Sequence, residues 1–241
     1  VERVFISVRA ATGPEMRRLV EICKRAGVPH KTLPAIGEII NGNLTIALRE
    51  VNYEDLLRRP PIQLDMAGIH DYLTGRRVLV TGCGGSICSE LCRQVMRFDP
   101  EALILVDASE ANLYHIETEL QHELNFEHCC GILGRVQDRS LMEKVFTKYR
   151  PHVVFHAAAC KHVPMLEKIP WEAIFNNVLG SQVVMEAAIR HGVERFVLVS
   201  TDKAVRPTSV MGTSKRIAEL LLQSLQGNGS NLMAVRFGNV I

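Results

Sequence analysis

From residue 77 onward, short runs of apolar residues alternate with longer segments of helical character. The apolar runs are VLVTG (78–82), LILVD (103–107), VVFHAAA (153–159), FVLVS (196–200) and MAVRFG (233–238). The helical segments are 86–98, 140–150, 171–192 and 209–225. Strands that are apolar almost throughout are typical of a parallel sheet that helices cover on both faces. The sequence therefore predicts an α/β fold with a doubly wound parallel sheet.

The first 76 residues have a different pattern. RVFISVR (3–9) has the character of a strand and GPEMRRLVEICKRAG (13–27) that of an amphipathic helix. We interpret residues 1–60 as the C-terminal part of a preceding α/β domain, residues 61–76 as a linker with one short helix, and residues 77–241 as the main domain, truncated at its C-terminus. Because the chain begins with Val and ends in a strand-like stretch, we expect it to be a fragment of a longer protein.

Composition narrows the range of possible functions. Lys and Arg number 28 and Asp and Glu 26, and the basic residues are scattered, which argues against a nucleic-acid surface. The seven cysteines form no CxxC pair, which favours reduced thiols in a cytosolic compartment and argues against a metal site. The longest apolar runs fall short of 18 residues, so we expect no membrane span within this sequence.

A glycine-rich turn, TGCGGSICSE (81–90), links the first strand of the main domain to the helix after it. Glycines in such a turn allow a sharp bend and a close approach of the backbone to a pyrophosphate, which the free amides and dipole of the helix N-terminus bind. The cofactor-binding residues that we expect in this turn are Gly82, Gly84, Gly85, Ser86 and Ile87.

An acidic residue ends the next strand. Asp107 follows the glycine turn at the spacing, about 20 residues, at which a carboxylate binds the adenosine ribose of a dinucleotide. A 2′-phosphate would meet this negative charge, so the sequence favours NAD over NADP. The strand, the glycine-rich turn, the helix after it and the acidic residue Asp107 together predict a Rossmann-type NAD site. Cys88 stands where a third glycine is usual, which predicts a small shift in the packing of the helix.

Further polar residues follow two other predicted strands and lie on the helix that begins near residue 209. In a doubly wound sheet, ligands bind at the edge where the parallel strands end. After the predicted strand at 153–155, three alanines offer a surface for close approach of the cofactor: Ala157, Ala158 and Ala159. Lys161 and His162 follow at the mouth of the site. After 196–200 come Thr201, Asp202 and Lys203. The helix from about residue 209 carries Met211 and Lys215 on one face. We interpret His156 as a packed or hydrogen-bonded histidine rather than a catalyst.

Four stretches resemble the extended short-chain dehydrogenases/reductases, and among them the nucleotide-sugar 4,6-dehydratases of capsule and O-antigen polysaccharide biosynthesis. They are TGCGGSICSELCRQ, HAAACKHVPMLE, STDKAVRPTSVMGTSKR and AVRFGNV. The resemblance implies that residues 77–241 are an NAD-binding catalytic domain and that membrane helices precede residue 1. It also implies a homo-oligomer at the cytoplasmic face of the inner membrane.

The same resemblance implies a redox-neutral reaction on a UDP-N-acetylhexosamine, with UDP-N-acetylglucosamine as the expected substrate. NAD oxidises C4 of the sugar, water is lost across C5 and C6, and the hydride returns to C6. Loss of water requires a base for the C5 proton and an acid for the leaving hydroxyl. The resemblance assigns Lys203 as the base and Asp202 as the acid, with Thr201 bonded to the C4 hydroxyl.

Other roles follow from the resemblance alone. Lys215 would hold the nicotinamide ribose and Asn177 would lie near the cofactor, while Lys161, His162 and Asn239 would contact the substrate. Met211 occupies the position at which most of the superfamily carries a catalytic tyrosine.

A methionine at this position changes the route by which the proton of the C4 hydroxyl leaves. A thioether has no exchangeable proton, so Met211 cannot deprotonate the C4 hydroxyl. The proton must leave through Asp202 or through a water ordered by Lys215, and the sequence leaves both routes open.

Two alternative functions also fit the sequence. A UDP-sugar 4-epimerase or 4-dehydrogenase would share the cofactor and the oxidation step without the loss of water. A catalytically silent NAD-binding module is a different class of protein, and Cys88 and Met211 are the residues that suggest it.

Overall fold

The computed structural model describes residues 4–6, 13–32 and 65–238. The chain divides into two units, Val1–Leu64 and Asp65–Ile241. Asn239 and the stretch from residue 33 to residue 64, which contains part of the expected linker, lie outside the described residues.

The described residues of the first unit form a parallel pair of strands and a helix. β1 (Val4–Ile6) pairs with β2 (His30–Thr32), and α1 (Gly13–Arg25) lies between them in sequence. Ile6, Val20 and Cys23 form a small buried cluster between these elements. The strand and the amphipathic helix that the sequence predicts here are therefore present.

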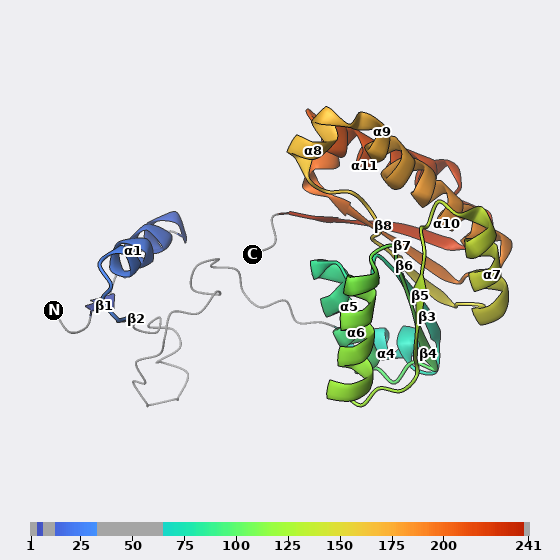
Figure 1. Ribbon diagram of the computed structural model, residues 1–241, viewed down its shortest axis with the longest axis horizontal. Helices are drawn as coiled ribbons and strands as arrows, with labels where there is room; N and C mark the ends of the chain where they lie inside the picture. Colours follow the sequence, from blue (N-terminus) through green and yellow to red (C-terminus); the bar gives the residue numbers. More distant parts are fainter. Residues whose placement is uncertain (1–3, 7–12, 33–64, 239–241) are drawn as a thin grey trace. The chain divides into compact units, whose positions relative to one another are not determined.

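The second unit is built on a six-stranded parallel sheet (Figure 1). Its strands are β3 (Arg77–Thr81), β4 (Ala102–Asp107), β5 (Cys129–Leu133), β6 (Val153–His156), β7 (Arg195–Thr201) and β8 (Asn231–Phe237). Their order across the sheet is β5-β4-β3-β6-β7-β8, and every neighbouring pair is parallel. The order reverses between β3 and β6, where ligands bind in sheets of this kind. The predicted doubly wound, Rossmann-type sheet is confirmed.

Helices cover both faces of this sheet (Figure 1). One face carries α4 (Met66–Leu73), α5 (Ser86–Met96) and α6 (Glu110–Thr118), and the other carries α7 (Arg139–Tyr149), α10 (Gly180–Arg190) and α11 (Val210–Ser224). The shorter helical segments are η1 (Glu119–Glu123), α8 (Val163–Lys168), α9 (Pro170–Glu172), η2 (Ala173–Leu179) and η3 (Asp202–Ala204). None of the helices among the described residues combines the length and the apolar character that a membrane span requires.

The strand β5 and the helix α6 are among the elements of the second unit that are absent from the sequence-based prediction. The edge strand β5 is partly exposed along its whole length, and Gly131 interrupts its apolar run. The helix α6 has only a weak apolar face, with Leu113 and Ile116 as its buried residues. Hydrophobic periodicity is a poor signal for such short, half-buried segments.

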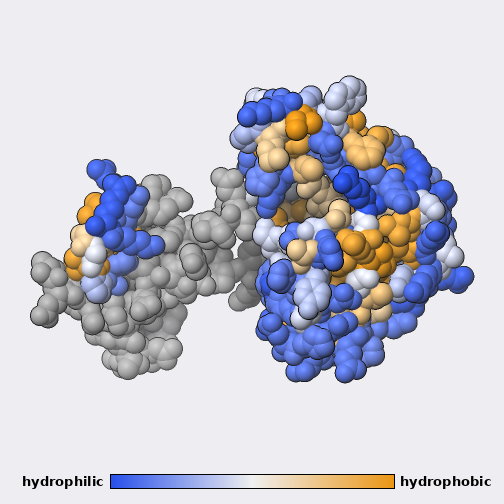
Figure 2. Space-filling view, in the orientation of Figure 1, coloured by the Kyte–Doolittle hydropathy of each residue, from blue (hydrophilic) through white to orange (hydrophobic). Residues whose placement is uncertain are grey.

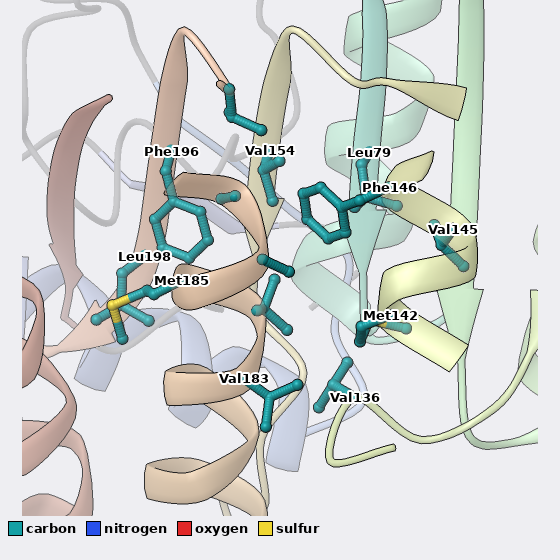
Figure 3. Packing of buried hydrophobic residues seen from close by; sticks show 14 of the residues in the cluster. Leu79, Val136, Met142, Val145, Phe146, Val154, Val183, Met185, Phe196 and Leu198 are labelled. Carbon is teal, nitrogen blue, oxygen red and sulfur yellow. The ribbon is translucent and has the colours of Figure 1, made fainter. Parts of the chain in front are cut away.

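The hydrophobic core lies in two layers, one on each face of the sheet. Along β3, Val78 and Val80 pack under α5 and α6, whereas Leu79 packs under α7 and α10. Figure 3 shows the second layer, in which Phe146 of α7 and Met185 of α10 pack over the strands. Burial of each large apolar side chain stabilises the fold by about 1.5–3 kcal/mol, so both helical layers are fixed on the sheet.

The helix α4 lies within the stretch interpreted as a linker. Asp65 caps it by accepting a hydrogen bond from the backbone N–H of Gly68 at 3.0 Å. Leu73, at its other end, is buried in the same layer as α5 and α6. The helix therefore packs on the sheet that it precedes.

Candidate active site

The glycine-rich turn after β3 packs closely against its neighbours. Gly82 has a φ of +71°, and a Cβ at this position would lie 2.8 Å from the backbone of Ala158, in the loop after β6. A Cβ on Gly84 would lie 2.4 Å from the Cβ of Asn112 on α6. Only glycine fits these approaches, because any side chain would push the neighbouring backbone away. The turn therefore brings β3, the loop after β6 and α6 together at one edge of the sheet.

Alanine at Gly82 should open this turn. We expect Gly82→Ala to destabilise the second unit by about 2–4 kcal/mol and to weaken NAD binding, since it adds both backbone strain and a clash with Ala158. Gly192→Ala is the matched control, because Gly192 has a φ of +65° but nothing within 4 Å of its added Cβ. Urea unfolding and an NAD titration compare the two variants. Equal losses in both would show that the close approach at Gly82 has no consequence.

The N-terminus of α5 lacks a side-chain cap of the kind that α6, α7 and α11 possess. Its N-cap residue is Gly85, whereas Ser109, Asp138 and Ser209 cap α6, α7 and α11. The first amides of α5 therefore keep their partial positive charge available to an anion. Five expected cofactor residues line this turn with exposed or half-buried positions: Gly82, Gly84, Gly85, Ser86 and Ile87.

Asp107, at the end of β4, is held against the same turn. Its Oδ2 accepts a hydrogen bond from the backbone N–H of Gly84 at 3.0 Å, and its Oδ1 accepts one from Ser109 at 2.9 Å. The residue is half-buried, so the fixed carboxylate still faces solvent on one side. The glycine-rich turn, which we call the glycine cradle, the uncapped N-terminus of α5 and the oriented carboxylate of Asp107 together fit the diphosphate and ribose of a dinucleotide.

The loop after β6 lies over the glycine turn. Ala157, Ala158 and Ala159 are half-buried, and the Nζ of Lys161 donates a hydrogen bond to the Oγ of Ser86 at 3.2 Å. His162 is exposed at the start of α8. The structure thus brings Lys161 to the N-terminus of α5, beside the glycine-rich turn. In Figure 2 the surface is hollowed between the region of α8 and α9 and the helices α5 and α6.

Asn177 of η2 is fully buried and holds this loop in place. Its Oδ1 accepts from the backbone N–H of Cys160 at 2.8 Å, and its Nδ2 donates to the carbonyl of Cys160 at 3.0 Å and to the Oγ of Ser214 at 2.8 Å. The side-chain amide is therefore fully used within the protein. Asn177 acts on the site by fixing the loop after β6 next to α11.

Thr201, Asp202 and Lys203 form a turn at the end of β7. The Oδ1 of Asp202 accepts hydrogen bonds from the Thr201 hydroxyl at 3.0 Å and from the Lys203 Nζ at 3.3 Å. These two hydrogen bonds lower the pKa of Asp202, so its carboxyl group is ionised in the ligand-free protein. Asp202 and Lys203 are both exposed and open to a ligand.

Lys215 of α11 is buried at the same edge of the sheet. It is 7% exposed, and its Nζ donates to the carbonyl of Val199, two residues before Thr201, at 3.0 Å. Burial lowers the pKa of Lys215 to about 8, although the nearby Glu219 carboxylate opposes this shift. An ammonium group has three donors, and among the described residues Val199 is the one that accepts from it.

Met211 lies one helical turn before Lys215 and faces a hydrophobic cluster. The residue is 5% exposed and packs with Leu166 of α8 and Ala173 of η2. Its side chain fills the space between three helices, so the structure gives it a packing role at the edge of the site.

Burial raises the pKa of the Cys88 thiol, just after the glycine-rich turn, to about 12, and that of the half-buried Cys129 thiol, at the start of β5, to about 11. Both thiols are therefore protonated at neutral pH, and Cys88 packs as a small apolar residue of the layer under α5. Within 4–6, 13–32 and 65–238, no three His, Cys, Asp or Glu side chains gather as a metal ion would need.

Comparison with known proteins decides the family of this chain. Residues 78–241 match the family described as polysaccharide biosynthesis protein. The chain belongs to that family. It is 42% identical over 245 residues to CapD of Staphylococcus aureus, a capsular polysaccharide biosynthesis protein, and the match covers 100% of this chain and 41% of CapD. The chain thus spans about two fifths of the length of this curated relative.

Solved structures of extended short-chain dehydrogenases/reductases share the fold. A UDP-glucose 4-epimerase of Thermotoga maritima, solved with UDP-glucose, has a TM-score of 0.59 and 26% identity over 68% of this chain and 56% of that one. A UDP-glucose 4-epimerase of Brucella ovis, solved with NAD, has a TM-score of 0.58 and 22% identity over 68% of this chain and 52% of that one. The resemblance of this family member to that superfamily is confirmed.

The site contains residues that sequence reasoning did not single out. A Cβ on Gly212 would lie 2.4 Å from the carbonyl oxygen of Lys203, so this glycine lets α11 approach the Thr201–Lys203 turn. Glu219, one helical turn after Lys215, is a buried carboxylate that contacts β7 and β8. The spacing of Gly212, Lys215 and Glu219 along one helix face is a signal that the sequence does contain.

Proposed function

We propose that this chain is the NAD-binding catalytic part of a UDP-N-acetylhexosamine 4,6-dehydratase that acts in surface polysaccharide biosynthesis. One observation carries the proposal: the glycine cradle after β3 and the Thr201–Asp202–Lys203 turn after β7 lie at the same edge of one parallel sheet, with β6 between them. The similarity to CapD supports the pathway, since CapD is a capsular polysaccharide protein. UDP-N-acetylglucosamine is the substrate that we propose.

The residues of the cradle support NAD as the cofactor. Gly82 and Gly84 leave no room for side chains, the α5 amides lack a cap, and Asp107 is placed for ribose hydroxyls. Bound NAD would supply the oxidant for C4 of the sugar and the reductant for C6. The role of the chain is to place both reactants at the β6 and β7 strand ends and to move protons there.

The Thr201–Asp202–Lys203 turn would remove water from the oxidised sugar. In the ligand-free protein Asp202 is ionised and paired with Lys203, which is the reverse of the states that an acid Asp202 and a base Lys203 require. Our proposal therefore requires the substrate to separate this ion pair, with one proton passing from the Lys203 ammonium to the Asp202 carboxylate. The desolvation that accompanies substrate binding favours this transfer, because a neutral pair is easier to bury than two charges.

Lys215 would act on the nicotinamide ribose. Two of its donors are left for ribose oxygens after the hydrogen bond to Val199, and its charge favours loss of the sugar hydroxyl proton nearby. Met211 packs against apolar neighbours and transfers no proton. In this proposal the proton of the C4 hydroxyl leaves through a water at Lys215, because the Asp202 carboxylate has already taken its proton from Lys203.

The decisive experiment is product analysis with the full-length protein. Incubation with UDP-N-acetylglucosamine and NAD should yield a 4-keto-6-deoxy sugar, which NMR identifies by the new C6 methyl group. The likeness to the UDP-glucose 4-epimerase of Thermotoga maritima supports a second candidate, a UDP-sugar 4-epimerase. An epimer would keep its 6-hydroxyl and its mass. NAD binding without turnover of any UDP-sugar would support the alternative of a catalytically silent NAD-binding module.

Substitutions in the Thr201–Asp202–Lys203 turn should strongly slow the dehydration step. We expect Asp202→Asn and Lys203→Ala each to lower kcat by about 10²–10⁴, because each removes one partner of acid–base catalysis. Asp71→Asn and Lys144→Ala, at exposed positions on α4 and α7, are the controls and should keep full activity. Steady-state kinetics on UDP-N-acetylglucosamine measures all four. Full activity in both turn variants would refute these roles.

Self-association and membrane attachment are further parts of the proposal. Large apolar residues are exposed on α9, η2 and α11, namely Trp171 (76% exposed), Ile174, Phe175, Leu179, Ile217 and Leu220. Figure 2 shows hydrophobic residues at the surface over α8 and α9. Such an exposed surface supports a homo-oligomer, which light scattering of the full-length protein tests. Cell fractionation tests our proposal that the full-length protein is anchored at the cytoplasmic face of the inner membrane.

A further inference from the structure

One face of α11 contacts the end of β7 and the turn after it at three successive points. Gly212, Lys215 and Glu219 are three and four residues apart, so they lie in a row along the helix. Gly212 meets the carbonyl of Lys203, as described above, and Lys215 donates to the carbonyl of Val199. The third contact is the carboxylate of Glu219, which accepts a hydrogen bond from the Oγ of Ser200 at 2.7 Å.

The Glu219 carboxylate is buried and saturated with donors. The residue is 3% exposed, and besides Ser200 it accepts two hydrogen bonds from Arg236 of β8, at 2.8 and 2.6 Å, and one from Arg216 at 3.0 Å. The hydrogen bonds from Arg236 make the largest contribution in lowering the pKa of Glu219 to about 2, so it is ionised throughout the physiological range. A saturated, charged hydrogen-bond cluster of this kind is rigid because moving any member leaves a buried charge unpaired.

This cluster connects three elements at the residue before the catalytic turn. Ser200 directly precedes Thr201 in β7, so fixing its side chain on α11 also fixes where the turn begins. Arg236 attaches β8 to the same carboxylate, and neighbouring strands β7 and β8 pair in register up to Thr201. A loss of this attachment would let the turn shift relative to Lys215.

Glu219 also supplies the negative charge nearest in sequence to Lys215. The titratable groups that act on the buried Lys215 ammonium are Cys88 of α5, Glu219 of its own helix and His156 of β6. Cys88 is protonated and His156 is neutral at pH 7, since burial raises the pKa of the thiol and lowers that of the imidazole. Glu219 is therefore the charged group among them that favours the protonated form of Lys215.

We propose that Glu219 is a positioning residue of this active site, which fixes the Thr201–Asp202–Lys203 turn against α11 through Ser200 and keeps Lys215 protonated. The inference rests on the proposed function and deepens it, because it assigns a role to a residue that touches neither cofactor nor substrate. Arg236 and Arg216 hold the carboxylate in place. The two parts of the role, mechanical and electrostatic, are separated by different variants.

The electrostatic part is tested without any turnover. The pKa of Lys215 is measured in the full-length protein by NMR of lysines labelled at Cε, with Lys215→Met to assign the signal. Glu219→Gln should lower this pKa by roughly half a unit or more, because it removes the nearby negative charge. Glu119→Gln is the matched control, since Glu119 accepts a comparable pair of hydrogen bonds from Arg93 on another part of the unit. An unchanged Lys215 pKa in Glu219→Gln would overturn this part.

The mechanical part is tested by kinetics on the same proteins. Ser200→Ala keeps the Glu219 charge and its arginine partners, so it should fold, keep the Lys215 pKa and lower kcat by about 10-fold with KM within about threefold. Glu219→Gln should lower kcat further and move the loss of activity at alkaline pH to lower pH, whereas Glu119→Gln should do neither. If Ser200→Ala and Glu219→Gln both keep the wild-type kcat, Glu219 does not position the turn. If the wild-type protein itself forms no product, the proposed function fails, while the Lys215 titration still decides the coupling to Glu219.

Discussion

Replacing Lys215 with methionine should make the ligand-free protein more stable and inactive at the same time. Burial lowers the pKa of this lysine from 10.5 to about 8, which corresponds to about 3 kcal/mol of unfavourable free energy for the charged form. Methionine fills a similar volume without a charge, and the lost hydrogen bond to Val199 offsets about 1 kcal/mol of the gain. We expect the free energy of unfolding to rise by about 2 kcal/mol and the Tm by about 5 °C.

The pH dependence of this gain identifies its cause. The unfolded protein binds more protons than the folded one between pH 8 and pH 10.5, so wild-type stability rises with pH in this range. The advantage of Lys215→Met should therefore be constant below pH 8 and shrink above it. Urea unfolding at pH 7, 8, 9 and 10 measures it, with Lys144→Met on the surface of α7 as the control. A variant less stable than wild type at pH 7 would contradict the prediction.

Acid should destabilise the second unit through His156. This histidine is completely buried, and desolvation followed by the charge of Lys215 lowers its pKa to about 3. The unfolded state, with a histidine pKa near 6.5, binds more protons between pH 6.5 and pH 3, so stability falls as the pH falls through this range. From pH 7.5 to pH 4.5 we expect a loss of about 3 kcal/mol from this one group.

A substitution separates His156 from the carboxylates that also titrate in acid. In His156→Gln the fall in stability between pH 7.5 and 4.5 should be smaller by about 3 kcal/mol, although the variant is less stable at pH 7.5. His128→Gln, at an exposed position, should keep the wild-type pH dependence. Chemical unfolding at the two pH values measures all three proteins. An identical slope in His156→Gln and wild type would show that His156 does not titrate in this range.

The hydrogen bonds of His156 are those of a neutral imidazole. Ser181 donates its hydroxyl proton to the carbonyl of Asn177 at 2.6 Å, so its oxygen accepts from the Nε2 of His156 at 3.0 Å. The Nδ1 of His156 is then the acceptor for the hydroxyl of Thr81 at 2.7 Å. This chain of hydrogen bonds uses one neutral tautomer and joins β3, just before Gly82, to η2 and α10. The interpretation of His156 as a hydrogen-bonded residue agrees with these contacts.

Much of the fold and part of the candidate site can be predicted from the sequence. The parallel sheet follows from apolar runs such as 78–80 and 103–106, and the cofactor turn follows from Gly82, Gly84 and the acid at Asp107. These features depend on local backbone requirements and on periodicity, both of which the sequence displays directly. The edge strand β5 and the helix α6 lack such signals because their side chains are half exposed.

Only the tertiary structure decides which polar groups are buried and what they contact. The sequence presents Lys215, Asp202 and Glu219 as similar charged residues, yet Lys215 and Glu219 are buried on one face of α11 while Asp202 is exposed. Burial and hydrogen bonding set the charge of Lys215 and Glu219, and both depend on neighbours from β7 and β8. The sequence by itself determined the sheet and the cofactor turn, because these follow from local pattern; the state of each buried charge was decided by packing between elements.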